Sequence, residues 1–391
     1  MRTLLFAFLK ILKGFRRLRL KISGKSEDDI HSQRIVSGKA WEEFCDQLKL
    51  AGANLMYPGA PRDPFQQAEG VRYLTRLTRA GLEAFVEYSD PAFPVFRRTV
   101  HETVKMGADN PDNIYVNAQI SGNYEYRITG RRNTIDYIGF FTQNGNYGTT
   151  GGLAPCGKLE DRDLLLEPDG SFEIILSKTP KGENWIRIEE ETGLLMVRQT
   201  FLDRFREVPA EVRVENLDGR VAPDPVTPSM VDGGLQTAAM FVGGASLLFA
   251  RWANGFQKHT NRLPLFDPET SNAAGGDPNI IYYHSHWRLA DNESLEIEVT
   301  PPDCDSWNFQ LNNYWMESLD YRYFTVCINK ASAIYQPGGS VKLTVAHRDP
   351  GTPNWIDTCG HREGTMCWRW YRLKPGALQV EPVCRIVKIN H

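Results

Sequence analysis

The spacing of apolar and polar positions changes along the chain and then repeats. Apolar residues at helical intervals predict helices from Lys39 to about Leu55 and over Pro64–Tyr88. From about Ile114, apolar and polar positions alternate in short runs separated by Gly, Asn, Asp and Pro, as expected of β-strands. A third helix, predicted from Ser229 to about Gln257, precedes a second set of strands. These patterns predict a mainly β protein with helical additions.

Three short landmarks occur twice in the same order, which indicates an internal duplication. Pro111–Tyr115, Pro168–Ser171 and Asn184–Ile186 return as Pro278–Tyr282, Pro337–Ser340 and Asn354–Ile356, with offsets of 167, 169 and 170 residues. The small drift in offset is what loop insertions produce. We therefore predict two tandem β-sandwich, jelly-roll-like lobes, each preceded by a helix. Residues 38–218 form the first copy with its helices, and residues 219–391 form the second.

The segment that precedes these copies has its own composition. Residues 1–25 hold eight basic and no acidic residues, which leaves 37 basic against 48 acidic residues in the remainder. This acidic balance argues against nucleic-acid binding by the body. Apolar residues such as Leu5, Phe8 and Leu12 recur at helical intervals in the head, which favours a helix on an anionic membrane surface. A mitochondrial presequence, a docked helix and a disordered tail are the alternatives, and residues 23–37 are interpreted as a linker.

Length and cysteine content narrow the class further. A chain of 391 residues with 41% apolar residues is large enough for two packed cores. Its seven cysteines form no C-x-x-C pair, which favours free thiols in a reducing, intracellular compartment. The sequence contains no run of about 18 apolar residues, so no transmembrane helix is predicted. Oligomeric state is not predicted.

Three strings carry a resemblance to a known family. They are Asp-Asn-Pro-Asp-Asn at 109–113, Trp-Met-Glu-Ser-Leu-Asp-Tyr at 315–321 and Asn-Trp-Ile-Asp-Thr-Cys-Gly-His at 354–361. The chain resembles the family called domain of unknown function 1214, often found beside domain of unknown function 1254, over roughly residues 65–390. The resemblance implies an all-β, sandwich-like fold with helical additions, and it implies no activity.

Positions that differ between the copies are candidates for function. His284 and His286 lie two apart on a predicted strand, so both rings face one side, where copy one has Asn117 and Gln119. Two imidazoles on one face are half of a transition-metal site, so a divalent metal is the one cofactor considered. The alternative is that both are hydrogen-bonded or surface histidines. No other cofactor is predicted.

A polar strand in copy two suggests a ligand site. Trp307, Phe309 and Leu311 face one way, and Asn308, Gln310 and Asn312 face the other. In an approximate alignment, copy one has Asp136, Ile138 and Phe140 at the positions of these three amides. Amides beside aromatic rings suit a polar or glycan-like small molecule. The predicted ligand-binding residues are Gln310, Asn312, Trp315, Tyr321, His347, Asn354 and Asn113.

A carboxylate and an imidazole four residues apart offer a second hypothesis. Asp357 and His361 could act as an acid–base pair, with Glu317 as a further carboxylate, in a hydrolase or lyase. A metal at His284 and His286 is an optional part of this hypothesis. No nucleophile motif accompanies them. The third hypothesis is a structural interaction module without a small-molecule ligand. Of the three, we expect a binding protein whose site lies in copy two and which acts at a membrane surface.

Overall fold

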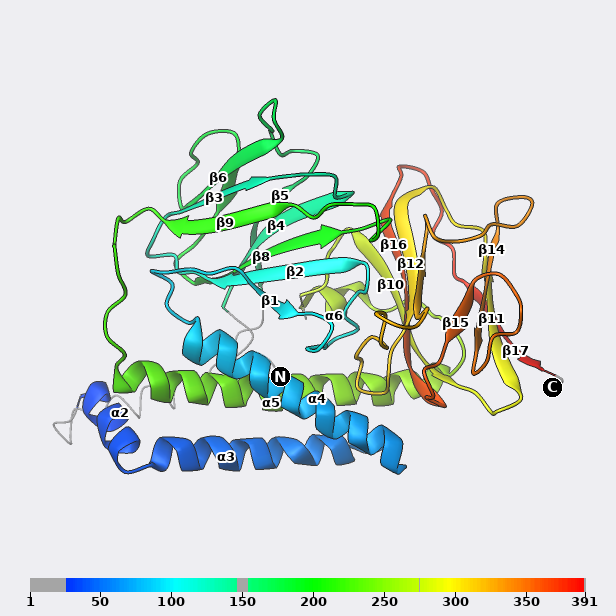
Figure 1. Cartoon of the computed structure of the whole chain (residues 1–391), viewed down its shortest axis with the longest axis horizontal. Helices are drawn as coiled ribbons and strands as arrows, with labels where there is room; N and C mark the ends of the chain where they lie inside the picture. The colour runs from blue at the N-terminus through cyan, green and yellow to red at the C-terminus, as the bar shows by residue number, and fades with distance from the viewer. Residues whose placement is uncertain (1–25, 146–153, 274, 390–391) are drawn as a thin grey trace.

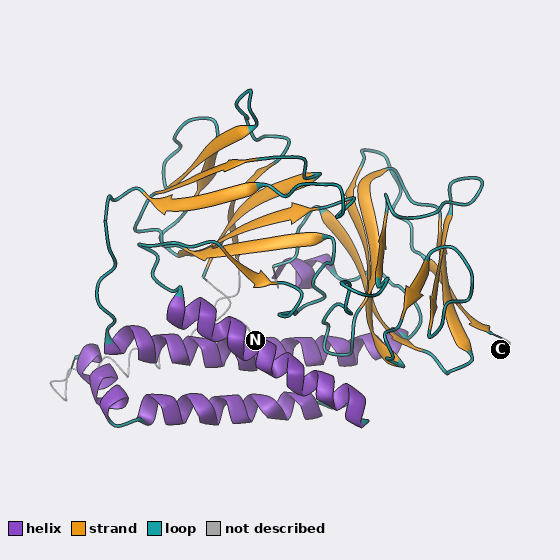
Figure 2. Cartoon of the chain, in the orientation of Figure 1, coloured by secondary structure: helices purple, strands orange, loops and turns teal. Residues whose placement is uncertain are grey.

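The computed structural model describes residues 26–145, 154–273 and 275–389. Two β-sandwich lobes lie side by side; the first lies above a layer of long helices and the second lies at one end of this layer (Figure 1). Figure 2 shows that helices gather on one side of the molecule and that the strands fill the two lobes. The prediction of a mainly β chain with two sandwich lobes and helical additions is confirmed.

The first lobe pairs a five-stranded sheet with a four-stranded one. The larger sheet has the order β1-β2-β8-β4-β5 and the smaller has the order β7-β6-β3-β9. The strands are β1 (Arg97–Val100), β2 (Asn113–Gln119), β3 (Tyr126–Arg131), β4 (Tyr137–Asn144), β5 (Ala154–Glu160), β6 (Ser171–Ser177), β7 (Trp185–Arg187), β8 (Thr192–Thr200) and β9 (Glu211–Asn216).

The second lobe pairs two four-stranded sheets. Their orders are β10-β16-β12-β13 and β15-β14-β11-β17. The strands are β10 (Ile280–Arg288), β11 (Glu293–Val299), β12 (Cys304–Leu311), β13 (Cys327–Asn329), β14 (Val341–Ala346), β15 (Trp355–Asp357), β16 (Glu363–Leu373) and β17 (Val383–Lys388).

Strand order shows that the two lobes share one topology. Replacing β2 to β9 by β10 to β17 in sequence converts each sheet of the first lobe into a sheet of the second, apart from the additional edge strand β1. Even the exceptional parallel pair recurs, as β6 with β7 and as β14 with β15. An internal duplication explains this match, as the repeated landmarks predict.

The helices of the two copies form one layer. α2 (Glu27–Val36), α3 (Lys39–Ala51), α4 (Pro64–Leu82) and α5 (Pro228–Phe256) lie beneath the lobes, and α6 (Pro268–Ala273) is a short helix between them (Figure 1). α5 contacts α2, α3 and α4. Over the described residues 26–37, the interpretation as a linker is wrong, because Glu27–Val36 forms α2, which begins at a capping box of Ser26 and Asp29.

α5 passes a simple test for a membrane span. With η3 (Gln257–His259), it is the one helix in the described ranges that is long and apolar enough to cross a membrane, by length and composition alone. Its apolar face contributes Leu235, Phe241 and Val242 to a core shared with α3 and α4. The core helix of a folded body passes the same test, so this finding leaves the compartment open.

Two sandwich cores fix which strand positions face outward. In the first lobe, Phe140, Leu195 and Val197 point into the core. In the second, Trp307, Phe309 and Leu311 do so, as the alternation predicts. The intervening positions on these strands therefore point out of each sandwich.

Candidate ligand-binding site

The outward faces of the β1-β2-β8-β4-β5 sheet and the β10-β16-β12-β13 sheet line a cavity between the lobes. This interlobe cavity has a volume of about 160 Å³. Its walls come from both lobes and from the helical layer. They include Thr99, Asn113, Tyr115, Asn117 and Arg198 of the first lobe, Tyr282, His284, Arg369 and Tyr371 of the second, and Phe249 and Trp252 of α5.

A tyrosine–arginine pair occurs at the same place in both lobes. Tyr115 on β2 is opposite Arg198 on β8, and Tyr282 on β10 is opposite Arg369 on β16. In each pair the guanidinium carbon lies 5.8 Å from the tyrosine ring centroid. Both arginines are buried, with exposed fractions of 6% and 4%. The duplication thus places two buried cations in one cavity.

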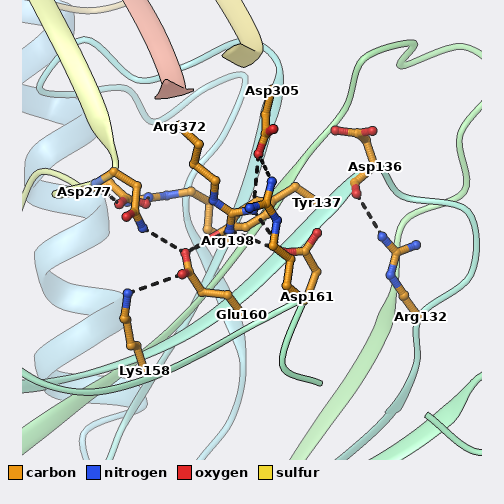
Figure 3. Close-up of polar contacts among 12 residues, drawn as sticks. Arg132, Asp136, Tyr137, Lys158, Glu160, Asp161, Arg198, Asp277, Asp305 and Arg372 are labelled. Carbon is orange, nitrogen blue, oxygen red and sulfur yellow. Dashed lines mark hydrogen bonds and ion pairs between the residues drawn. The ribbon is translucent and has the colours of Figure 1, made fainter. Parts of the chain in front are cut away.

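Arg198 has a carboxylate partner. Its Nη1 donates to Asp277, which precedes the first strand of the other lobe (Figure 3). The ring of Phe141 on β4 packs over the same guanidinium, at 5.3 Å from its carbon to the centroid. Asp277 is itself buried, so the pair is a desolvated ion pair across the lobe interface.

Arg369 is held by neutral oxygens. Its Nη1 donates to Gln310 Oε1 at 2.5 Å and to Asn308 Oδ1 at 3.3 Å, and its Nη2 donates to the Ala108 carbonyl at 2.6 Å. Arg369 forms no ion pair with any carboxylate of residues 26–145, 154–273 or 275–389. The rest of the sequence contains no Asp or Glu. The polar strand face of copy two therefore holds a buried cation rather than facing solvent.

The carbonyl that Arg369 contacts belongs to an unusual backbone segment. Gly107 and Ala108 both have positive φ, at 64° and 57°. A side chain at Gly107 would collide with the ring of Phe249, because a Cβ there would lie 2.8 Å from Cζ. Alanine in the left-handed region costs roughly 1–2 kcal/mol, so the surrounding contacts hold this segment in place. One such contact joins the Ala108 N–H to the Met316 carbonyl at 2.7 Å.

His284 contributes a neutral ring to the cavity wall. It stacks on Tyr282 and Phe256, with ring centroids 5.7 and 5.5 Å away. Burial, with a smaller contribution from the positive charge of Arg369, lowers the pKa of His284 to about 3. Its Nε2 lies 3.8 Å from the Cys367 sulfur, and its Nδ1 has no partner among the described residues.

Some of the buried polar atoms that lack a hydrogen-bond partner belong to residues of this cavity. Thr99 Oγ1, Asn117 Nδ2, Arg198 Nε and His284 Nδ1 are buried atoms without a hydrogen-bond partner in the described part of the chain, and all four residues line the interlobe cavity. A buried polar group left unpaired costs about 1–3 kcal/mol, so such groups are rare unless a ligand or water meets them.

A neighbouring cavity of about 280 Å³ between the lobes differs in character. Its arginines pair with carboxylates, several of which are drawn in Figure 3. Arg372 contacts Glu160 and Asp161 at 3.0 and 3.3 Å, and Asp305 contacts Lys374 and Arg162. This network links the lobes, and its cations already have acidic partners.

The structure separates the residues of the acid–base hypothesis. Asp357 accepts from the backbone of Cys359, His361 Nδ1 lies 3.4 Å from Gln66 Oε1, and Glu317 is buried against Arg76 and Asn313. No contact joins Asp357 to His361 within the described ranges. Burial, followed by the positive charge of Arg72, lowers the pKa of His361 to about 4. None of the three residues lines the interlobe cavity.

The predicted ligand residues divide into two groups. Asn113 lines the interlobe cavity, and Gln310 and Asn312 lie behind it, because Gln310 bridges Arg369 and Asn312. The others have structural partners elsewhere: Trp315 packs on Gly70, Tyr321 lies against Lys105, His347 contacts Thr358, and Asn354 bonds to the Ile334 backbone.

The two predicted metal ligands have separate surroundings. His284 lies in the aromatic wall described above, whereas His286 contacts Thr260 at 3.1 Å and Glu363 at 3.3 Å. The described residues contain no group of three or more His, Cys, Asp or Glu that could hold a metal ion. The geometry thus gives no support to the metal hypothesis.

Strand register also corrects one alignment. Asn308 and Gln310 are opposite Arg369 and Cys367, and Gly139 and Phe141 are opposite Arg198 and Met196. The copy-one counterparts of the amide face are therefore Gly139, Phe141 and Gln143, rather than Asp136, Ile138 and Phe140. Arg198 and Arg369 were missed because only long-range strand pairing brings them together.

Comparisons with known proteins are consistent with this two-lobed β-sandwich class. A crystal structure of an uncharacterised protein from Burkholderia cenocepacia is 51% identical, covers 91% of this chain and 98% of its own, and superposes with a TM-score of 0.88. The chain belongs to the family of that protein. The VPA0106 protein from Vibrio parahaemolyticus is 11% identical over 88% of this chain and 100% of its own, with a TM-score of 0.46, which is too low to support an argument.

Two further comparisons found no match. No family model matches the chain, so the resemblance to domain of unknown function 1214 stays a prediction. No curated protein matches it either.

Proposed function

We propose that this protein binds a small polar molecule in the interlobe cavity. The observation that carries the proposal is the set of unpartnered buried atoms on Thr99, Asn117, Arg198 and His284, all on the walls of one cavity. Ligand sites combine apolar walls with a few convergent polar groups, and Phe249 and Trp252 supply such walls here.

The proposed site differs from the one expected from sequence. The second lobe contributes Arg369 and His284, but the first lobe and α5 complete the walls. A cavity of about 160 Å³ suits one small ring or a short chain, since a protein cavity of about 150 Å³ accommodates benzene. We therefore propose a small polar molecule in place of a glycan chain.

The competing hypotheses receive less support from the geometry. A hydrolase or lyase built on Asp357 and His361 would need these two side chains to contact each other. In the structure Asp357 accepts from the Cys359 backbone, and His361 lies against Gln66. A purely structural module would leave the polar atoms of the cavity without a role. The membrane-surface proposal concerns residues 1–25, which lie outside the described residues.

The experiment is a fragment screen by ligand-observed NMR on the full chain and on Asn117→Leu. Leucine has nearly the size of asparagine but cannot donate, so fragments that bind in the cavity should lose saturation transfer in the variant. Removing an unsatisfied amide should leave stability equal or raise it by up to about 1 kcal/mol.

An exposed matched variant, Asn123→Leu, should bind fragments like the wild type. Fragments whose signals are unaffected by Asn117→Leu, or a chain that binds none, would contradict binding in the interlobe cavity. The structural module would then be the better account.

A further inference from the structure

We infer that the ligand of the interlobe cavity is a small carboxylic acid and that Arg369 holds its carboxylate. This inference rests on the proposed function, because it names the chemical class that the same cavity takes.

The guanidinium of Arg369 is a buried positive charge. A buried guanidinium remains protonated, and a buried charge is costly unless it is paired. Arg369 is 4% exposed, and its hydrogen bonds to described residues go to Gln310, Asn308 and Ala108, which carry no charge. An anion entering the cavity would neutralise it in a medium where charge–charge attraction is strong.

Two carboxylates near Arg369 have other hydrogen-bond partners, although Asp109 also lines the cavity and interacts electrostatically with Arg369. Asp109 accepts from Ser318 at 2.9 and 2.8 Å. Burial raises the pKa of Asp109, and Lys105 is the cation that opposes this shift most. Asp112 contacts Asn308 and Cys327, and burial raises its pKa too. Neither carboxylate forms an ion pair with Arg369 among the described contacts.

The duplicated lobes differ at the residue that would pair with the arginine. Arg198 finds its carboxylate at Asp277, the residue before Pro278, and the equivalent position before Pro111 is Asn110. Asn110 contacts Asn308 at 2.6 Å and Tyr371 at 2.6 Å. Asn308 also accepts from Arg369, so a single side chain links Asn110 to Arg369. The scaffold offers a counter-ion position for Arg369, and this chain places an amide there.

Some donors of Arg369 remain without an acceptor among the described residues. A guanidinium has five N–H groups. Three of those of Arg369 donate to Gln310, Asn308 and Ala108, which leaves the Nε–H and one Nη2–H without an acceptor in the described part of the chain. Two N–H groups of one guanidinium are what a carboxylate accepts in a bidentate contact. Asn117 Nδ2 is a further donor on the cavity wall.

The rest of the cavity is small and partly apolar. Met106, Phe249 and Trp252 give it an apolar side that suits a hydrocarbon body. Its volume of about 160 Å³ limits the ligand to about six to ten non-hydrogen atoms, by comparison with the benzene-sized cavity of about 150 Å³. A guanidinium without an ion-pair partner among the described residues, together with an apolar side, favours a monocarboxylate over inorganic phosphate.

The test compares isosteres by isothermal titration calorimetry on the full chain. The probes are butyrate against butyramide, benzoate against benzamide, and inorganic phosphate. At least one acid should bind about tenfold or more tightly than its amide, the difference expected for charge-assisted hydrogen bonds. Phosphate should bind more weakly than that acid.

Two variants locate the binding. Arg369→Gln removes the cation. Asn110→Asp keeps the cation but places a carboxylate of the protein beside it. Each variant should weaken binding of the acid about tenfold or more. Asn110→Asp is nearly isosteric, so it tests the inference even if Arg369→Gln fails to fold. Arg362→Gln changes the same charge at an exposed site and should leave binding unchanged.

The outcomes distinguish the inference from the proposed function. Equal binding of acid and amide, or tighter binding of phosphate, overturns the carboxylate assignment. If neutral fragments still respond to Asn117→Leu, the cavity remains a binding site. Acid binding that both Arg369→Gln and Asn110→Asp leave intact would also overturn the inference, because the carboxylate would then be held elsewhere.

Discussion

The two buried arginines of the interlobe cavity occupy equivalent positions in the strand register, but only one of them has a carboxylate partner. Arg198 lies between the rings of Tyr115 and Phe141 and pairs with Asp277. Arg369 lies on the ring of Tyr282 and donates to amide and carbonyl oxygens. The same scaffold thus holds one neutralised arginine that ties the lobes together and one that remains available for an external anion.

One loop position in each copy explains the difference. Asp277 and Asn110 each precede a landmark proline, and each reaches toward the opposite lobe. A carboxylate at one position and an amide at the other make the pseudo-symmetric interface electrically asymmetric. Under the proposed function, the duplicated fold uses one of two equivalent arginines for structure and the other for binding.

The largest expected effect comes from breaking the neutralised pair. Asp277→Asn gives Arg198 the amide that Arg369 has, and it leaves a desolvated cation. Removing one partner of a buried ion pair typically costs about 3–5 kcal/mol. Urea unfolding at neutral pH, followed by tryptophan fluorescence, should show this loss in the free energy of unfolding. A loss below about 1 kcal/mol would mean that the two arginines are energetically alike.

A second effect concerns His284, whose lobe-one counterpart is Asn117. The folded pKa of about 3 lies below the unfolded value of about 6.5, so the unfolded chain binds the extra proton between these pH values. Stability from the neutral ring is therefore present above pH 6.5 and is lost as pH falls towards 3. Between pH 6.5 and 4 the wild type should lose about 3 kcal/mol through this residue.

His284→Asn installs the lobe-one residue and removes this titration. Its free energy of unfolding should fall less steeply with acid, while His361, with a pKa of about 4, continues to contribute in both proteins. Parallel pH profiles of wild type and His284→Asn would show that His284 titrates normally in the folded chain. Urea unfolding at several pH values provides the comparison.

Local sequence pattern predicted much of the fold. The landmark pairs lie on equivalent strands, such as β2 with β10 and β7 with β15, and the alternation in Trp307–Asn312 assigned both faces correctly. The alternation was expected to begin at about Ile114, so it did not predict β1, because Arg97–Val100 is short and charged. The pattern is also weak at β5, because Ala154–Glu160 contains Pro155 and Gly157.

The site was harder to predict than the fold. Alternation shows that Asn308 and Gln310 leave the sandwich core, but not that the other lobe covers them. Tyr115 with Arg198 and Tyr282 with Arg369 occur in both copies, so a search restricted to positions that differ between the copies did not select them. Asn113, Gln310 and His284 were identified as candidates, each from its local chemistry.

The most direct test of the difference between the two arginines is a bromide soak of crystals of the full chain, with the ion located by anomalous diffraction. Bromide is a small monoanion that accepts hydrogen bonds. We predict a peak in the interlobe cavity at the guanidinium of Arg369, no peak at Arg198, and loss of the Arg369 peak in Asn110→Asp. A peak at Arg198, or a wild-type cavity with no peak at either arginine, would contradict the account.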